Sequence, residues 1–256
     1  MALFAIADLH LPGPYGEGKS MEVFEDRWRG YTEKLERNWR ACVGPDDSVV
    51  IPGDISWAMR LPDAVDDLKF IDSLPGTKYL GKGNHDFWWT TVKSMNKLFG
   101  ELGLSTLRIL YNNSYVLPEC PIIGARGWYL DPENQKTVED TDWNKICQRE
   151  LIRLQLSISS LPPGTDMSNV CLFLHFPAVY AGSESKEFVG LIRDSGIRRC
   201  FYGHVHGYYG PGCDFEHEGI RFEMISADRL NFTPKLILPS PAGDSGLRNE
   251  NKNEVI

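Results

Sequence analysis

Short apolar runs, many of them rich in β-branched or aromatic residues, alternate along the chain with longer amphipathic segments. A short apolar run bounded by turn residues is typical of a buried strand, and its alternation with helical patterns is typical of an α/β fold. We expect strands at Leu3–Ala7, Ser48–Ile51, Lys78–Gly81, Thr106–Leu110, Tyr115–Leu117, Ile122–Ala125, Val170–Leu174, Arg199–Tyr202 and Ile220–Ile225. Only turn residues separate the runs between Thr106 and Ala125, so we expect hairpins there and either a mixed sheet or two sheets.

The amphipathic segments carry apolar residues at steps of three and four, which places these residues on one face of a helix. The longest spans Met21–Val43, and another begins after Asp140 and stops at Pro162. Shorter helices are expected at Asp63–Ser73, Trp88–Phe99 and Ser185–Ser195. We interpret residues 1–242 as a single domain, because residues 243–256 are rich in Asn, Glu, Lys and Gly and predict a disordered tail.

The composition argues against several classes of protein. A chain of 256 residues with a formal net charge of −8 argues against a protein that mainly binds nucleic acid, because such binding depends on a basic surface. No apolar run approaches the roughly 18 residues of a membrane span, and the N-terminus has no basic leader, so we expect a cytoplasmic protein. The six cysteines are irregularly spaced, without a C-x-x-C pair, and are expected to be free thiols.

Polar clusters that follow directly after expected strands hold five of the six histidines. In open α/β sheets, ligands bind beyond the carboxyl ends of the strands, so these clusters are expected to meet at one site. They are Asp8-Leu9-His10, Gly53-Asp54, Gly83-Asn84-His85-Asp86, His175 and Gly203-His204-Val205-His206. A single cluster of this kind is common on exposed loops, but the whole set favours one functional site.

The residue types in these clusters favour metal binding. Asp8 and His10 are two positions apart, as are His204 and His206, and on an extended chain this spacing directs both side chains to one side. Carboxylates together with imidazoles suit Mn, Fe, Zn, Ni or Co better than Ca or Mg alone. We expect two divalent metal ions, roughly 3.5–4 Å apart, with Asp54 as the bridging carboxylate.

The order of these clusters resembles the scattered motifs of the calcineurin-like metallophosphoesterases, which run D-x-H, G-D, G-N-H-[DE], H and G-H-x-H. The resemblance extends from Asp8 to His206 and implies a four-layer α/β/β/α sandwich with mixed sheets. It also implies a dinuclear metal site, for which Mn²⁺ is the ion expected in vitro. The implied ligands are Asp8, His10 and His206 for the first ion, Asn84, His175 and His204 for the second, and Asp54 as the bridge.

His85 is the motif histidine to which the resemblance gives no metal; it implies that this imidazole stabilises or protonates the leaving alkoxide. The phosphoprotein phosphatase branch of the family has an acid and an arginine where this chain has Trp57 and Ala58, so the usual partner that orients the histidine is missing. Asp86 is a candidate replacement. The mechanistic hypothesis is attack on phosphorus by a metal-bridging hydroxide, formed as the pKa of water falls from about 15.7 toward about 7. His85 and Asp54 are then the catalytic residues.

Several residues near these clusters have two open interpretations. Arg126 follows a strand and either binds substrate phosphate or is structural. Trp88 either stacks on a nucleobase or aromatic leaving group or packs in the core. Tyr208 and Tyr209 either line the mouth of the site or cap the sheet.

The predicted function is metal-dependent hydrolysis of a phosphomonoester or phosphodiester, with a small molecule or a nucleotide as the substrate. A nuclease of the same superfamily and a non-catalytic metal-binding scaffold are the alternatives. The net charge disfavours the nuclease, and the presence of every expected ligand together with His85 disfavours the scaffold. The sequence predicts neither the individual substrate nor the oligomeric state.

Overall fold

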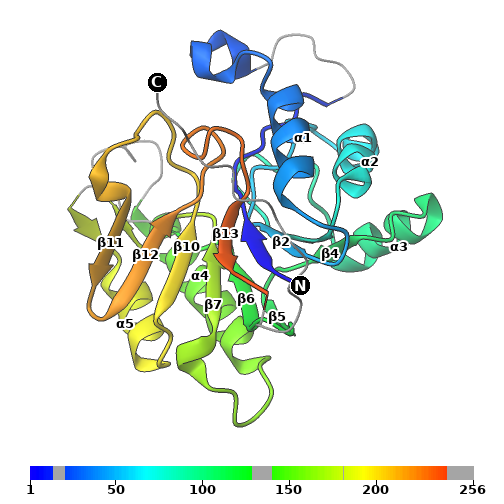
Figure 1. Ribbon diagram of the computed structural model, residues 1–256. Coiled ribbons are helices and arrows are strands. Elements are labelled where there is room, and N and C mark those ends of the chain that lie inside the picture. Colours follow the sequence, from blue (N-terminus) through cyan, green and yellow to red (C-terminus); the bar gives the residue numbers. More distant parts are fainter. Residues whose placement is uncertain (14–20, 129–139, 181, 241–256) are drawn as a thin grey trace.

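The computed structural model describes residues 1–13, 21–128, 140–180 and 182–240 (Figure 1). The tail predicted at residues 243–256 lies outside these ranges. Among the described helices, none has both the length and the apolar character needed to cross a membrane. The six cysteines are free thiols, as predicted.

The first sheet has five strands in the order β13-β1-β2-β3-β4. Their bounds are β1 Leu3–Ala5, β2 Ser48–Ile51, β3 Thr77–Leu80, β4 Leu107–Ile109 and β13 Lys235–Leu238. Strands β1 to β4 run parallel, and β13 pairs antiparallel with β1. The loops that leave β1, β2 and β3 consequently emerge along one edge of this sheet.

The second sheet has six strands in the order β11-β12-β10-β7-β6-β5. Their bounds are β5 Asn113–Val116, β6 Pro121–Ala125, β7 Cys171–Leu174, β10 Arg199–Tyr202, β11 Asp214–His217 and β12 Ile220–Met224. The four central strands are parallel, and β5 and β11 are antiparallel edge strands. A small hairpin, β8 (Val179–Tyr180) with β9 (Ser183–Glu184), lies outside both sheets.

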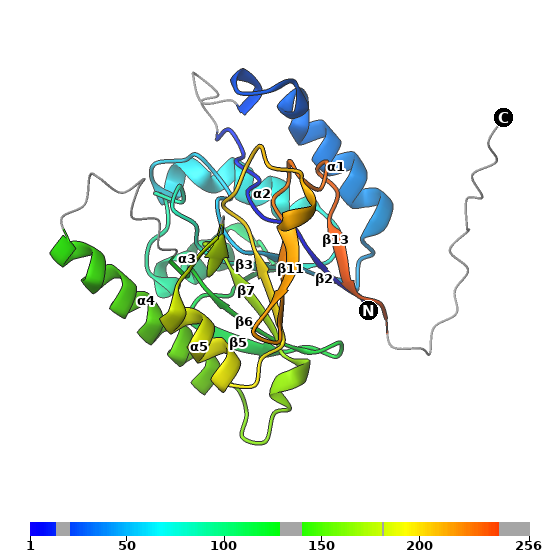
Figure 2. The same cartoon turned by 90° about the vertical axis from the view of Figure 1, so that its left-hand side faces the viewer.

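Helices cover the outer face of each sheet, as the two views in Figures 1 and 2 show. The helices on the first sheet are α1 Tyr31–Cys42, α2 Val65–Ser73 and α3 Val92–Leu102, and those on the second are α4 Asp140–Ser159 and α5 Lys186–Asp194. Successive strand residues face opposite layers: Phe4 packs toward the helices, whereas Leu3 and Ala5 join Phe173 between the sheets. The predicted four-layer α/β/β/α arrangement with mixed sheets is confirmed.

The helix predicted over Met21–Val43 is shorter than its apolar pattern indicates. Two 3₁₀ turns, η1 (Met21–Val23) and η2 (Asp26–Trp28), precede α1. Gly30 then takes a left-handed conformation, with φ of 60°, which an α-helix cannot continue through. The apolar side chains before Gly30 are therefore placed by turns, and several of them lie beside the site described next.

The edge strands β11 and β13 and the β8–β9 hairpin were not predicted from the sequence. Strand β11 is short and mostly polar, and β13 is half-exposed along its length, so neither has the buried apolar run of a central strand. Their positions follow from their partners, β12 and β1, rather than from local pattern.

Candidate metal centre

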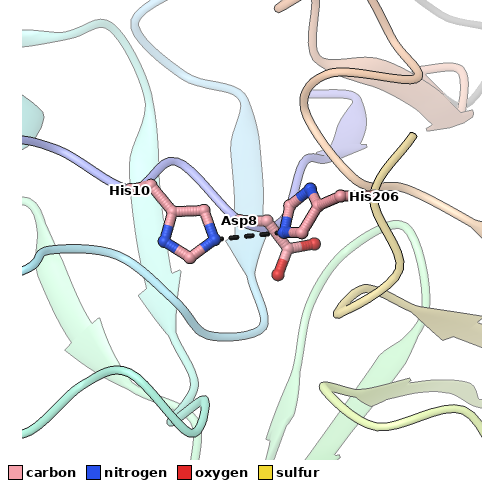
Figure 3. A group of neighbouring side chains, drawn as sticks. All are labelled: Asp8, His10 and His206. Atoms are coloured by element: carbon pink, nitrogen blue, oxygen red, sulfur yellow. Dashed lines mark hydrogen bonds between the residues drawn. The ribbon is translucent and has the colours of Figure 1, made fainter. Parts of the chain in front are cut away.

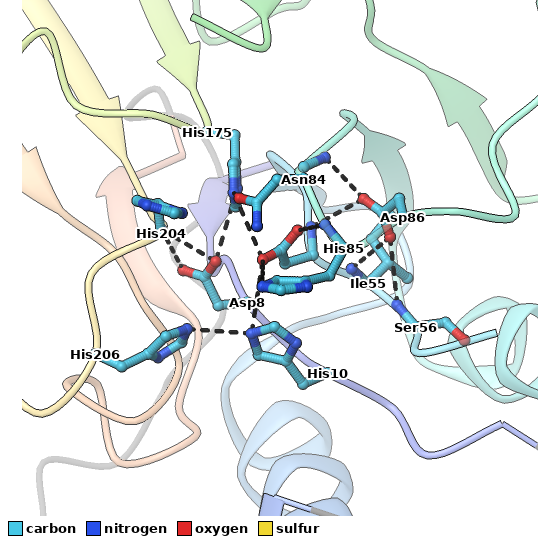
Figure 4. A network of polar contacts seen from close by, with 12 residues as sticks. Asp8, His10, Ile55, Ser56, Asn84, His85, Asp86, His175, His204 and His206 are labelled. Carbon is cyan, nitrogen blue, oxygen red and sulfur yellow. Dashed lines mark hydrogen bonds and ion pairs between the residues drawn. The ribbon is translucent and has the colours of Figure 1, made fainter. Parts of the chain in front are cut away.

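The five polar clusters lie together where the carboxyl ends of the parallel strands of both sheets meet (Figure 4). Contacts between the clusters join the two sheets: the backbone N–H of His204, after β10, donates to both oxygens of Asp8, after β1, at 3.0 and 2.9 Å. The isolated bridge between Ala7 and Ser226 joins the same sheets one residue earlier. The convergence expected from the strand-end rule is thus present.

The first group of candidate ligands consists of Asp8, His10 and His206, whose donor atoms all lie within 4.8 Å of one another. Figure 3 shows the imidazoles of His10 and His206 facing each other, with Nε2 to Nε2 3.1 Å, beside the carboxylate of Asp8. Asp8 and His10 are buried, and His206 is partly exposed. Two imidazoles and a carboxylate at this spacing are a donor set suited to a divalent cation.

The second group consists of Asp54, His175 and His204. His175 Nε2 lies 3.5 Å from Asp54 Oδ2 and 2.7 Å from Asn84 Oδ1, so the amide predicted as a ligand adjoins this group. The same Oδ2 of Asp54 lies 3.7 Å from Nε2 of His10, which belongs to the first group. One carboxylate oxygen therefore lies between the two candidate groups.

Several candidate ligands lie on backbone in the left-handed conformation, whereas the prediction from their spacing assumed an extended chain. The φ angles are 60° at Asp8, 45° at His10, 51° at Asp54 and 71° at His204. Such values are uncommon for residues other than glycine and asparagine or aspartate. His204 and His206 accordingly belong to different groups, as the resemblance implies, although the spacing alone directs both side chains to one side; Asp8 and His10 belong to the same group.

Glycines in the same clusters leave space for the buried carboxylates. A Cβ on Gly83 would lie 2.0 Å from Oδ1 of Asp54, and a Cβ on Gly203 would lie 2.5 Å from Oδ2 of Asp8. Asp54 Oδ1 also accepts the backbone N–H of His85 at 2.8 Å. The carboxylates of Asp54 and Asp8 thus pack directly against the backbone of Gly83 and Gly203. A side chain at either glycine would occupy the space that the carboxylate fills.

The electrostatics of the two groups fit metal binding. Burial raises the pKa of Asp8 to about 6 and that of Asp54 well above its usual range. Burial and the neighbouring histidines lower the pKa of His10 and His175 strongly, and that of His204 to about 3. The imidazoles of His10, His175 and His204 are therefore neutral, with lone pairs available, beside carboxylates whose charged form is disfavoured by burial. A divalent cation would supply a compensating positive charge.

Unsatisfied atoms support the same fit. Nδ1 of His10 and Nδ1 of His175 are buried and have no hydrogen-bond partner among the described residues. The latter lies 3.7 Å from Oδ1 of Asp8. Buried polar atoms are almost always bonded, so such atoms in a cluster of metal-binding residue types fit a site that binds a cation.

Asp228, which the sequence analysis missed, holds His206. Its Oδ1 lies 3.2 Å from Nδ1 of His206, and its Oδ2 accepts the backbone N–H of Gly207 at 3.0 Å and the Tyr209 hydroxyl at 3.2 Å. Burial lowers the pKa of His206, but the bond to Asp228 and the charges of Asp8 and Asp228 outweigh it and leave the pKa raised. Asp228 follows the expected strand Ile220–Ile225, so the strand-end rule could have found it.

Asp86 has a different task from the one predicted. Its carboxylate accepts backbone N–H bonds from Asp54 (2.9 Å), Ile55 (2.8 Å) and Gly83 (2.8 Å), and none of its bonds comes from the ring of His85 (Figure 4). It ties the loop after β2 to the loop after β3. Asp86 therefore positions Asp54 rather than orienting the neighbouring histidine.

The side chain of Trp57 packs against His85. The two rings are 4.5 Å apart between centroids, and the indole also stacks on His10 at 4.8 Å with an interplanar angle of 21°. Nε2 of His85 lies 4.0 Å from Oδ2 of Asp54, and the His85 side chain is about one-third exposed, 37%. An indole thus occupies the position at which the phosphatase branch has an acid.

The remaining predicted residues have these positions. Trp88 is fully buried and donates its indole N–H to Asp86 at 3.0 Å, so the predicted stacking on a substrate is wrong and its core interpretation holds. Arg126 donates to the buried Glu150 at 3.0 Å and lies over the ring of Trp128, and its contact with substrate stays a prediction. Tyr209 reaches Asp228 and Glu25 at the mouth of the site.

Two mixed sheets between helices, with carboxylates and imidazoles gathered at the shared loop edge, define a metallophosphoesterase-like fold. Residues 1–208 match the family described as calcineurin-like phosphoesterase, and the chain belongs to this family. Members are typically metal-dependent phosphohydrolases. No curated protein matches the chain.

Solved structures with this fold are distant in sequence. The chain is similar to phosphopantetheinyl hydrolase (PptH) from Mycobacterium tuberculosis, with 16% identity, 96% of this chain and 98% of that chain covered, and a TM-score of 0.56. It is also similar to TT1561 of Thermus thermophilus, with 12% identity, 89% of each chain covered and a TM-score of 0.51. At these identities the likeness shows the fold alone.

Proposed function

We propose that this protein is a dinuclear-metal-dependent phosphoesterase that hydrolyses a phosphomonoester or phosphodiester of a small molecule or nucleotide. The observation that supports it best is the position of Asp54, whose Oδ2 lies 3.7 Å from His10 Nε2 and 3.5 Å from His175 Nε2. The proposed ligands are Asp8, His10 and His206 for one cation, Asn84, His175 and His204 for the other, and Asp54 for both.

Mixed imidazole and carboxylate donors suit Mn, Fe, Zn, Ni or Co, and we expect Mn²⁺ to support activity in vitro. When bound, such a pair of cations supplies Lewis acidity toward the phosphoryl oxygens and toward water. The chain itself contributes preorganised ligands: Asp228 fixes the ring of His206, and Asp86 fixes the loop that carries Asp54. The cytoplasmic location expected from the sequence stays a prediction.

His85 is the proposed general acid. Its ring is partly exposed, whereas Asp8, His10 and His175 are buried, so an incoming ester meets it first. The backbone N–H of His85 donates to Oδ1 of Asp54, which holds the His85 backbone beside this proposed ligand, and Nε2 of the ring lies 4.0 Å from Oδ2 of the same carboxylate. From there Nε2 is placed to give a proton to the departing ester oxygen.

Hydrolysis of p-nitrophenyl phosphate and of bis-p-nitrophenyl phosphate, with Mn²⁺ and with a chelator, tests the proposal. Turnover of either ester that the chelator abolishes is the expected result, and the ratio of the two rates separates monoesterase from diesterase. Purified protein without turnover and without bound metal would refute the proposal.

Two variants separate the proposed roles. His85→Ala is expected to keep its metal content and to lower kcat by about 10²–10⁴-fold, the usual contribution of a general acid. Asp54→Ala is expected to lose metal. His217→Ala is the matched control, because His217 lies on β11 and contacts Glu184, outside both groups. Unchanged turnover in His85→Ala would remove the general-acid role.

A further inference from the structure

A pocket of about 370 Å³ opens onto the candidate metal centre. Its polar floor is formed by His10, His85 and His206. Its walls are largely apolar and come from Met21, Phe24, Trp28 and Trp57. The 3₁₀ turns before α1 and the loop after Asp54 supply these walls, so segments outside the five polar clusters shape the pocket.

Trp57 belongs to the apolar wall and also contacts two of the residues proposed to act in the reaction. Its indole contacts both His10, a proposed ligand, and His85, the proposed general acid. If His85 gives a proton to the ester oxygen, that oxygen lies next to the imidazole of His85. The carbon group bonded to this oxygen then extends into the space beside the imidazole. That space is the pocket between Trp57, Trp28 and Phe24.

We infer that this pocket binds the alcohol half of the substrate, and that this half is compact, uncharged and apolar or aromatic. The inference rests on the proposed phosphoesterase function and names the substrate class for it. Aromatic rings prefer offset or edge-to-face contacts with other rings, each worth about 0.5–1.5 kcal/mol beyond burial. A cavity of about 150 Å³ holds benzene, so a pocket of about 370 Å³ has room for a larger ring system or a branched alkyl group.

A negative charge at the pocket disfavours alcohols that are themselves negatively charged. Among the described residues that line the pocket, Glu25 is the charged one apart from the histidines, and its carboxylate accepts the Tyr209 hydroxyl at 3.1 Å. A carboxylate at the mouth repels leaving groups that carry further phosphates or carboxylates. Nucleoside polyphosphates and nucleic acids are therefore disfavoured as substrates, whereas neutral alcohols are not.

Two exposed apolar side chains lie at or near the pocket. Phe24 is 67% exposed and Phe87 53%. Phe24 lines the pocket, and the ring of Phe87 lies 6.2 Å from that of His85, another residue of the lining. Large apolar side chains gathered at the mouth of a site are a recognised mark of ligand binding.

The test compares two esters of primary alcohols, 2-phenylethyl phosphate and glycerol 3-phosphate, so that the reactivity of the leaving group is matched. For Phe24→Ser, kcat/KM for the phenylethyl ester is expected to fall about tenfold, equivalent to about 1.4 kcal/mol, and kcat/KM for glycerol 3-phosphate to stay within about twofold. Phe24→Leu is expected to recover most of the loss. Val116→Ser is the control, because Val116 is equally exposed, at 62%, but lies on the edge strand β5.

Binding of 3-phenylpropylphosphonate, the non-hydrolysable analogue of the phenylethyl ester, is measured by calorimetry on the same variants. Weaker phosphonate binding to Phe24→Ser but not to Val116→Ser supports the pocket, even if neither ester is hydrolysed. A lack of hydrolysis would overturn only the proposed function. Phosphonate binding and kcat/KM for both esters that are the same in Phe24→Ser as in wild type would overturn the proposed pocket. They would leave the proposed phosphoesterase function standing.

The charge argument has its own measurement. Glu25→Gln preserves an acceptor for Tyr209 and removes the charge. It is expected to raise kcat/KM for 2-(4-carboxyphenyl)ethyl phosphate about threefold, the size of a partly screened charge contact, and to leave the phenylethyl ester unchanged. An equal effect on both esters would overturn the selection by charge.

Discussion

Gly83→Ala tests the packing on which the candidate metal centre depends. The added Cβ would lie 2.0 Å from Oδ1 of Asp54 and 2.4 Å from its backbone nitrogen, whereas ordinary contacts begin near 3.4 Å. One of the two residues must therefore move by about 1.4 Å, the difference between 2.0 and 3.4 Å. Gly83 is not free to retreat, because its N–H donates to the buried carboxylate of Asp86 at 2.8 Å.

The displacement therefore falls on Asp54, which we place between the two cations. A misplacement of about 1 Å at a reacting centre costs about 10²-fold in rate. We expect kcat for p-nitrophenyl phosphate to fall by at least about 100-fold, or about 2.7 kcal/mol in activation free energy. Overpacking of the buried loop should also lower the free energy of unfolding by about 1–3 kcal/mol.

Turnover, bound metal by mass spectrometry after dialysis, and urea denaturation measure the three effects. Gly100→Ala is the matched control, because a Cβ on Gly100, inside α3, meets nothing within 4 Å. It is expected to stabilise the protein by about 0.5–1 kcal/mol and to leave metal and turnover unchanged. Wild-type metal content and kcat in Gly83→Ala would refute the reasoning about Asp54.

Three further changes have expected outcomes. Asp228→Asn weakens a charge-assisted bond to His206 and should lower Mn²⁺ affinity by about 10–100-fold in calorimetric titration. Burial raises the pKa of Asp67 to about 6, above its unfolded value of 3.8, so its stabilising contribution is complete below about pH 4 and is lost as the pH rises through 6. Asp67→Asn should remove up to about 3 kcal/mol of that pH dependence from urea denaturation between pH 4 and 7. Thr91→Ala removes the oxygen that accepts the Ser94 N–H at the start of α3 and should cost about 1 kcal/mol.

Each of these outcomes has a contrary result. Asp194→Asn, an exposed carboxylate on α5, should leave Mn²⁺ affinity unchanged; an equal loss in both variants would show a general charge effect rather than support of His206. Parallel stability curves for wild type and Asp67→Asn would show that Asp67 ionises normally. An unchanged midpoint for Thr91→Ala would mean that the cap contributes nothing to α3.

The site could be predicted to the extent that local pattern and topology determine it. His10, His85 and His204 each follow a short apolar run, and parallel strands end at a common edge, so their convergence followed from the sequence. The direction of each side chain did not, because left-handed backbone at Asp8 and His204 replaces the extended chain that the spacing assumed. Such conformations depend on partners distant in sequence, such as the bond between these two residues.

Tertiary contacts also decided the roles of neighbouring residues. Asp86 and Trp88 lie beside His85 in sequence, yet both turn inward, where the carboxylate accepts bonds from two loops and from the indole. Nothing in the sequence indicates which loops will lie beside them. Trp57 shows the converse, since its position in the motif was noted as a departure, but only the structure places its ring against His85.

The position of β13 has a consequence for how the protein is made. Strand β1, which ends just before Asp8 and His10, pairs on one side with β13, the last described strand, at residues 235–238. At a ribosomal rate of about 5–20 residues per second, roughly 10–45 s separate the synthesis of β1 from that of this partner. His206 and Asp228 also emerge late in translation. The nascent chain thus displays Asp8 and His10 long before His206 and Asp228 exist, and the first candidate group stays incomplete until those later residues have been synthesised.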